Sequence, residues 1–138
     1  MVIEWREEWL LGEERIDAEH LEAVSLINAL HGAVGRGESR EVLATLLRAL
    51  LARSREHFAY EEGLMAAGGY AHAADHAEQH QRLLGILTMA LETVDMADGE
   101  MVLGTVGVFD DWFITHVETS DAALGRFLGE QAGGEQAG

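Results

Sequence analysis

Apolar residues recur along the chain every three or four positions, which is the period of an α-helix that buries one face. No segment shows the sustained alternation of apolar and polar residues that is typical of a half-buried strand. The stripes run from His20 to Val34, from Leu43 to Met65, from His76 to Val94 and from Val102 to His116. Four stripes of this kind predict an all-α fold.

Turn and capping residues separate the four stripes. Asp17 is the expected N-cap of the first helix and Ser39 that of the second, because their side-chain oxygens can accept hydrogen bonds from free backbone N–H groups. Glycine is expected to end these two helices, at Gly35 and at the pair Gly68-Gly69, and the segment 95–99 to end the third. Short connections between four helices predict an up-down-up-down antiparallel four-helix bundle.

Both ends of the chain differ from the four stripes. An N-terminal arm, expected to lie across one open side of the bundle, carries Trp5, Trp9, Leu10 and Leu11. After the fourth stripe, Ala122–Leu128 predicts a short amphipathic C-terminal helix. Residues 129–138 consist of the sequence Gly-Glu-Gln-Ala-Gly repeated twice. Because they carry no large apolar side chain, they predict a flexible tail. One domain over residues 1–128 and a tail over 129–138 are therefore expected.

Polar side chains interrupt the apolar stripes on both sides of the second turn. In an antiparallel pair of helices, two residues lie at the same height when they are equally far from the turn between them. His57 and His80 are equally far from Gly68-Gly69, and so are Glu61 and His76. Within each helix these pairs are four residues apart, so each pair shares one face. The pattern predicts that the four side chains meet inside the bundle.

The same rule extends this group across the other two turns. It pairs His20 with His57 and His80 with His116. Asp121 follows His116 by five residues, a step that rotates about 140° away from the shared face of a straight helix. Asp121 can therefore join the group only if the helix ends or distorts near Thr119, a residue type that disfavours helix interiors.

In the order and spacing of these residues the chain resembles the hemerythrin family. The resemblance covers about residues 5–125 and rests on Trp5, Gly12, Ile16-Asp17, His20, the run His57–Met65, Gly69-Tyr70, His76, His80, Trp112, His116 and Asp121. Two positions depart from the family pattern: Ala71 stands where proline is usual, and Glu19 where glutamine often precedes the first histidine.

This resemblance implies a non-haem diiron centre that binds dioxygen reversibly. One iron would be held by His76, His80 and His116, and the other by His20 and His57. Glu61 and Asp121 would bridge the two ions together with an oxo or hydroxo ion, which leaves one coordination position for dioxygen. Apolar side chains near the ligand faces are expected to cover that position and exclude water: Ala23, Val24, Phe58, Trp112, Phe113 and Val117.

Three further polar residues are expected to lie outside the centre. His31 sits on the face of His20 but three turns away, so we expect a structural role. His72 lies four residues before His76, and a ligand pair is conceivable, but we favour a position at the rim or surface. Glu62 points about 100° away from Glu61 and is expected to be solvated.

Composition limits the chemistry and the partners. The chain has no Cys, which excludes thiolate metal sites and iron–sulfur clusters and leaves His, Asp and Glu as ligands. A formal net charge of -16 disfavours nucleic acid and anionic lipid. Met1–Leu10 lacks the apolar core of a signal peptide and no stretch could span a membrane, so we expect a cytoplasmic protein.

Three functions fit these expectations. The first is an oxygen carrier, store or delivery protein that is not an enzyme and serves a recipient enzyme; a monomer is favoured. The second is an oxygen or redox sensor fused to a signalling domain. The third is a diiron enzyme: a ferroxidase, peroxidase or nitric oxide reductase. Iron itself rests on the resemblance, because imidazole-rich sites also accept Zn, Co or Mn.

Overall fold

Helices make up almost all of the structure, a computed structural model that describes residues 3–94, 96 and 99–137. Its helices are η1 (Glu7–Trp9), α1 (Glu14–Gly35), α2 (Arg40–Gly68), α3 (Ala73–Thr93), α4 (Gly99–His116), η2 (Val117–Asp121) and α5 (Ala122–Ala137). No strand occurs among the described residues. The all-α prediction is confirmed.

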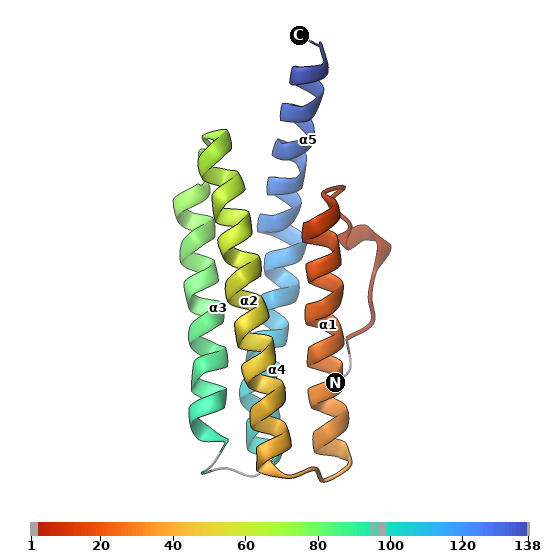
Figure 1. The fold of residues 1–138 in the computed structure, drawn as a ribbon, viewed down its shortest axis with the longest axis vertical. Helices are drawn as coiled ribbons and strands as arrows, with labels where there is room; N and C mark the ends of the chain where they lie inside the picture. The colour runs from red at the N-terminus through yellow and green to blue at the C-terminus, as the bar shows by residue number, and fades with distance from the viewer. Residues whose placement is uncertain (1–2, 95, 97–98, 138) are drawn as a thin grey trace.

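The four long helices α1 to α4 form an antiparallel bundle (Figure 1). Each packs against the next one in sequence, and α4 returns to contact α1, so the ring is closed. The α1–α2 connection, the end of α3 and the start of α4 lie at one end, and the α2–α3 turn lies at the other. This is the predicted up-down-up-down order, in which short connections place consecutive helices side by side.

Local chemistry explains where most helices begin and end. Ser39 caps α2, since its hydroxyl accepts a hydrogen bond from the backbone N–H of Val42 at 3.2 Å. Gly69 ends α2 in the left-handed conformation, with φ of 65°, which a residue without Cβ adopts freely. The predictions for both residues are confirmed.

The prediction that Asp17 caps α1 is wrong. The helix begins one turn earlier, and Glu13 is its N-cap, with a side-chain oxygen 2.7 Å from the N–H of Ile16. The Asp17 carboxylate instead accepts hydrogen bonds from the N–H groups of Leu11 and Gly12, at 2.8 and 3.1 Å. Asp17 therefore ties the N-terminal arm to the helix, a contact that lies outside the helix and escapes a capping rule.

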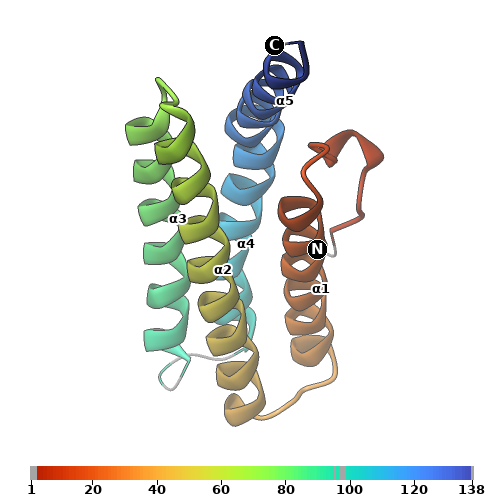
Figure 2. The same ribbon diagram turned by 45° about the horizontal axis from the view of Figure 1, so that its top comes forward.

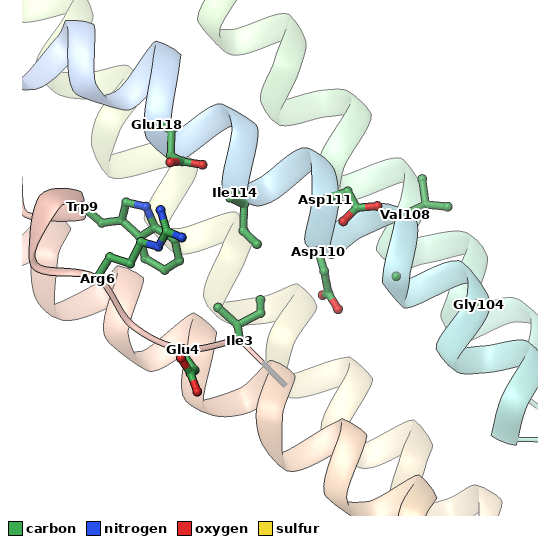
Figure 3. Close-up of a pocket in the computed structure, with 11 residues that line it drawn as sticks. Ile3, Glu4, Arg6, Trp9, Gly104, Val108, Asp110, Asp111, Ile114 and Glu118 are labelled. Atoms are coloured by element: carbon green, nitrogen blue, oxygen red, sulfur yellow. The ribbon is translucent and has the colours of Figure 1, made fainter. Parts of the chain in front are cut away.

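The N-terminal arm runs along α1 and faces α4. Ile3 exchanges two hydrogen bonds of 2.8 Å with the Asn28 side chain, and Trp9 is buried, whereas Leu10 stays exposed. A groove with a volume of about 900 Å³ lies between the arm and α4. Figure 3 shows Ile3 and Trp9 on one side of this groove and Ile114 on the other. The arm thus covers one side of the bundle, as expected.

The C-terminal helix is longer than expected. It follows η2 and α4 without a break and runs beyond the bundle to Ala137 (Figures 1 and 2). Two contacts hold it against the α2–α3 turn: Phe127 packs on Tyr70 with ring centroids 4.7 Å apart, and the Gln131 amide donates to the Gly68 carbonyl at 3.1 Å. The expectation that the helix ends at residue 128 is therefore corrected. The flexibility of residues 129–138 stays a prediction, and residue 138 lies outside the described residues.

The apolar core fills the bundle in two connected parts. One part, at the end of the α1–α2 connection, includes Leu30, Leu47 and Val102. The other includes Val24 and Phe113 and surrounds the polar side chains described below. None of the helices, over the residues described, is long and apolar enough to cross a membrane.

Substituting Ala for Gly104 or Gly107 is expected to stabilise the protein. Both glycines lie inside α4, and a Cβ added at either would meet no atom within 4 Å. Glycine costs a helix interior about 1 kcal/mol relative to alanine, so each change should raise the free energy of unfolding by about that amount. Chemical denaturation of the two variants measures the effect; no gain in either would contradict this account of α4.

Candidate metal centre

Seven polar side chains meet inside the bundle, in the half nearer the α2–α3 turn. They come from all four long helices and η2, and none is more than 5% exposed: His20, His57, Glu61, His76, His80, His116 and Asp121. These are the residues that the spacing rule and the resemblance bring together.

The donor atoms of these residues form two overlapping groups. One group comprises Glu61, His76, His80, His116 and Asp121, and the atoms within it all lie within 4.8 Å of one another. The other comprises His20, His57, Glu61 and Asp121, within the same limit. The two carboxylates belong to both groups. Such an arrangement can hold two metal ions side by side.

A wide helical turn brings Asp121 into the cluster. From Val117 to Asp121 the backbone forms a π-helix, and the N–H of Ala122 bonds to the carbonyl of Val117, five residues back. A π-turn adds a residue to the helical turn, so the five-residue step from His116 returns to the same face. The distortion expected near Thr119 is confirmed, and the Thr119 hydroxyl there donates to the Thr115 carbonyl at 2.7 Å.

Asp121 contacts histidines of both groups. One of its oxygens lies 3.1 Å from Nε2 of His20, and the other lies 2.9 Å from Nε2 of His76 and 3.1 Å from Nε2 of His116. A carboxylate held in this way can place one oxygen on each of two neighbouring cations.

Glu61 spans the cluster in the same manner. One oxygen lies 3.0 Å from Nε2 of His76 and 3.3 Å from that of His80. The other oxygen faces Nε2 of His20 at 3.6 Å and also contacts His57. Both carboxylates are therefore central, with imidazole nitrogens arranged around them.

Three of the histidines are held from outside by residues of a neighbouring helix. Nδ1 of His57 lies 3.0 Å from a Glu19 oxygen, and Nδ1 of His80 lies 2.9 Å from a Glu62 oxygen. An acceptor at this position fixes the proton on Nδ1, which leaves Nε2 as the atom that can give a lone pair to a metal. The expectation that Glu62 is merely solvated is wrong: its side chain is only 36% exposed and contacts His80.

Gln79 orients the third histidine, His116, by the same kind of contact to Nδ1. Its side-chain oxygen lies 2.6 Å from Nδ1 of His116 and also accepts a hydrogen bond from the Ser120 hydroxyl at 2.8 Å. Gln79 therefore links α3 to both α4 and the π-turn. This contact was not predicted.

The cluster fits a pair of metal ions better than it fits a self-contained polar core. Buried atoms without a hydrogen-bond partner include Nε2 of four site histidines and oxygens of both carboxylates: His20, His57, His80, His116, Glu61 and Asp121. Each unpaired buried polar group costs about 1–3 kcal/mol, so a pair of bound cations that satisfies these atoms would stabilise the folded protein. Imidazole nitrogens and carboxylate oxygens suit iron, and they also suit zinc, cobalt and manganese.

In the metal-free cluster, the histidines and the two carboxylates shift one another's pKa values. Burial lowers the pKa of His20, but the adjacent carboxylates of Asp121 and Glu61, 3.1 and 3.6 Å from its Nε2, outweigh it and raise the pKa to about 9. The same balance raises the pKa of His76 to about 9. Burial acts to raise the pKa of both carboxyl groups, yet the imidazoles around them hold each pKa well below its usual value. Protons on imidazoles thus balance the carboxylates, and bound metal would replace those protons.

Apolar side chains border the two-histidine group. The Phe113 ring lies 6.0 Å from the His20 ring, and the Phe58 ring lies 5.7 Å from the His57 ring. Phe58 also stacks on His80 of the three-histidine group at 4.0 Å. Phe58, Phe113 and Ala23 also line a small cavity beside His57. Val24 and Val117 are buried in the same part of the core as Phe58 and Phe113.

Trp112 does not share this position. Its side chain is 47% exposed and lines an outer groove with Gln79, Thr115 and His116, on the side of the three-histidine group. The expectation that Trp112 covers the site from inside is therefore corrected. Its helix presents the neighbouring residue, Phe113, to the core instead.

The remaining polar residues lie apart from the cluster, as expected. His31 contacts Asp110, with its Nε2 2.9 Å from a carboxylate oxygen, and so joins α1 to α4. His72 is exposed at the start of α3. Neither residue belongs to the two groups of potential metal ligands.

Comparison of the sequence with known protein families gives a match over most of the chain. The family model described as "Hemerythrin HHE cation binding domain" matches residues 11–128. The chain belongs to the hemerythrin family. The matched hemerythrin domain contains the whole seven-residue cluster and the first turns of α5.

Curated relatives agree with this assignment. The chain is 30% identical over 132 residues to a protein named bacteriohemerythrin from Ralstonia nicotianae, and the match covers 94% of this chain and 91% of the relative. It is 28% identical over 112 residues to the bacteriohemerythrin of Methylococcus capsulatus, covering 81% and 85% of the two chains. A hemerythrin-like protein of Naegleria gruberi is 25% identical over 117 residues, covering 85% and 86%. Membership of the hemerythrin family implies non-haem iron and oxygen binding, and the cluster is the set of residues that could hold metal.

Proposed function

We propose that this hemerythrin binds dioxygen reversibly at a diiron centre and serves as an oxygen carrier, store or delivery protein. The observation that supports the proposal most strongly is the pair of overlapping donor groups that share Glu61 and Asp121. The names of its relatives indicate a binding protein and not an enzyme. Dioxygen is then the ligand, and a recipient enzyme is the expected partner.

The two groups suggest how the irons would be held. His76, His80 and His116 would bind one ion, and His20 and His57 the other. Glu61 and Asp121 would bridge them, together with an oxo or hydroxo ion. Two ferrous ions would supply the two electrons that dioxygen takes up. The two-histidine ion has one protein ligand fewer, so dioxygen is expected to bind there.

The residues of the chain favour binding over activation of dioxygen. With five imidazoles and only two carboxylates as direct ligands, the metals would carry less negative charge than in the carboxylate-rich sites that help stabilise high-valent iron. The apolar side chains beside His20 and His57, Phe113 above all, would exclude water from the open position. Reversible binding requires both features.

An optical spectrum tests the proposal. The iron-loaded protein is reduced without air, its spectrum is recorded, and air is then admitted. A visible band that appears in air and disappears when oxygen is removed is the expected result. A band that never appears, or steady turnover of peroxide or nitric oxide by the reduced protein, would reject the carrier in favour of another role.

A second candidate role is an oxygen or redox sensor. One feature favours it: α5 continues from the π-turn that carries Asp121 and runs beyond the bundle (Figure 1). A change at Asp121 on oxidation would therefore be passed directly to α5 and to a signalling domain beyond it. Limited proteolysis of α5 in the reduced and oxygenated forms separates the roles, because only a sensor requires the two patterns to differ. A monomeric state and a cytoplasmic location stay predictions.

Replacing Phe113 is expected to change the rate at which the reduced protein is oxidised in air, whereas replacing Trp112 is not. Phe113→Leu opens space beside His20 and should speed the oxidation of the reduced protein in air, because water reaches the metals more easily. Trp112→Leu changes an exposed side chain and should leave that rate unchanged. The rate is followed by the visible spectrum; equal rates in the two variants would contradict the role given to Phe113.

A further inference from the structure

Outside the two donor groups lies a second set of polar side chains, which accept hydrogen bonds from the outer ring nitrogens of the candidate histidine ligands. Glu62 accepts from Nδ1 of His80, which belongs to the three-histidine group, and Glu19 accepts from Nδ1 of His57, which belongs to the two-histidine group. One carboxylate therefore stands behind each group. The third acceptor, Gln79 behind His116, is a neutral amide.

A carboxylate in this position changes the chemistry of the imidazole that it contacts. By accepting the Nδ1 proton in a strong hydrogen bond, it gives the ring partial imidazolate character and makes Nε2 a more basic donor. A more basic donor binds divalent ions more tightly and stabilises the higher oxidation state of iron. An amide acceptor orients the ring without adding this charge.

We propose that Glu19 and Glu62 are positioning residues that set metal affinity and reduction potential, one for each half of the site. The proposal rests on the proposed diiron function. Glu61 and Asp121 supply two negative charges inside the cluster, and the two outer carboxylates supply two more. The outer pair contacts imidazoles and not the positions of the ions, so it adds negative potential at a buried site without occupying a coordination position.

The two outer carboxylates suit this role because they connect the buried cluster to solvent. The side chain of Glu19 is 21% exposed and that of Glu62 is 36% exposed, whereas His57 and His80 are buried. Replacing either carboxylate by an amide of the same shape therefore removes charge from the site without opening a cavity in the core. A substitution of this kind isolates the electrostatic part of their role.

The first arm of the test measures cobalt(II) affinity by competition with a chelator. Glu19→Gln and Glu62→Gln are each expected to weaken binding by about 10- to 100-fold, as outer partners of metal-bound histidines usually do. The matched control is Glu56→Gln, which loses the same charge on an exposed side chain next to His57 and should bind cobalt normally. Equal affinity in all three variants overturns the proposal.

The second arm measures the reduction potential of the iron-loaded protein. Loss of either outer carboxylate should raise the potential, because the ferric state loses a stabilising negative charge. Gln79→Glu adds a carboxylate behind His116 and should lower it, whereas Gln81→Glu, an exposed site on the same helix, should not. A shift of the same sign in Gln79→Glu and Glu62→Gln would also overturn the proposal.

Nitrogen NMR of the metal-free protein tests the positioning role without any metal. His80 should carry its proton on Nδ1 in the native protein and in Glu62→Gln, and should lose this preference in Glu62→Ala. An unchanged His80 signal in Glu62→Ala argues against positioning. Neither this measurement nor cobalt binding involves oxygen, so a protein that binds no dioxygen would reject the proposed function and leave these results standing.

Discussion

Replacing Glu61 by Gln is expected to reduce the metal content from two ions per chain to at most one and to abolish oxygen binding. Glu61 belongs to both donor groups and faces histidines of α1, α2 and α3. Glutamine keeps the shape of the side chain but offers one oxygen and no charge. A single neutral oxygen cannot bridge two cations, and one of the two buried counter-charges is lost.

The metal content after dialysis against excess iron or cobalt measures this effect, together with the change in the visible spectrum on admitting air. Glu56→Gln on the same helix is the matched control, because it removes one charge from an exposed position. A Glu61→Gln variant that keeps two tightly bound ions would show that Glu61 does not bridge. Loss of both ions would indicate that the two halves of the site fill cooperatively.

The bundle could be predicted from sequence because its causes are local. The helical period, the Ser39 cap and the Gly69 turn each act over a few residues, and the structure has them where the pattern places them. Asp17 was misjudged because its partners lie in the arm and not in its own helix. The length of α5 was also missed, since Gln131 is anchored by Gly68, 63 residues away in the sequence.

The cluster itself was predictable for a geometric reason. In an antiparallel bundle with short turns, distance from the turn fixes height, and the rule brought five histidines and Glu61 to one level. The same rule places Glu19 and Gln79 near the heights of His57 and His116, so a search for acceptors beside each ligand would have found them. Glu62 lies more than a turn from the height at which His80 is expected, so only its long side chain explains the contact.

Helix geometry also explains the error at Trp112. Four residues before His116, a side chain lies about 40° to one side of the His116 direction, and three residues before, about 60° to the other. Both positions share the general face, which is why Trp112 and Phe113 were predicted together. The core reaches only the side that Phe113 occupies, so Trp112 is left 47% exposed.

Removal of the metal is expected to make the stability of this protein fall steeply as the pH rises. In the metal-free protein His20 and His76 have pKa values of about 9, raised above 6.5 by the carboxylates. Groups with a raised pKa contribute stability that is fully present below 6.5 and is lost as the pH rises through 9. Glu61 and Asp121, whose pKa values are lowered, contribute stability that is lost only in acid, below their ordinary range near 4. The metal-free protein should therefore be most stable between about pH 4.5 and 6.5.

Bound metal reverses this trend because it takes the place of the imidazole protons. Its affinity rises with pH as those protons cease to compete, so the metal-loaded protein should keep its stability to pH 9. A pKa raised from 6.5 to about 9 corresponds to about 3 kcal/mol for each imidazole. Thermal unfolding of both forms at pH 6 and pH 9 measures the difference. His20→Gln should flatten the alkaline loss in the metal-free form, whereas the exposed His72→Gln should leave it intact; an equal slope in the two variants would mean that the loss arises outside the cluster.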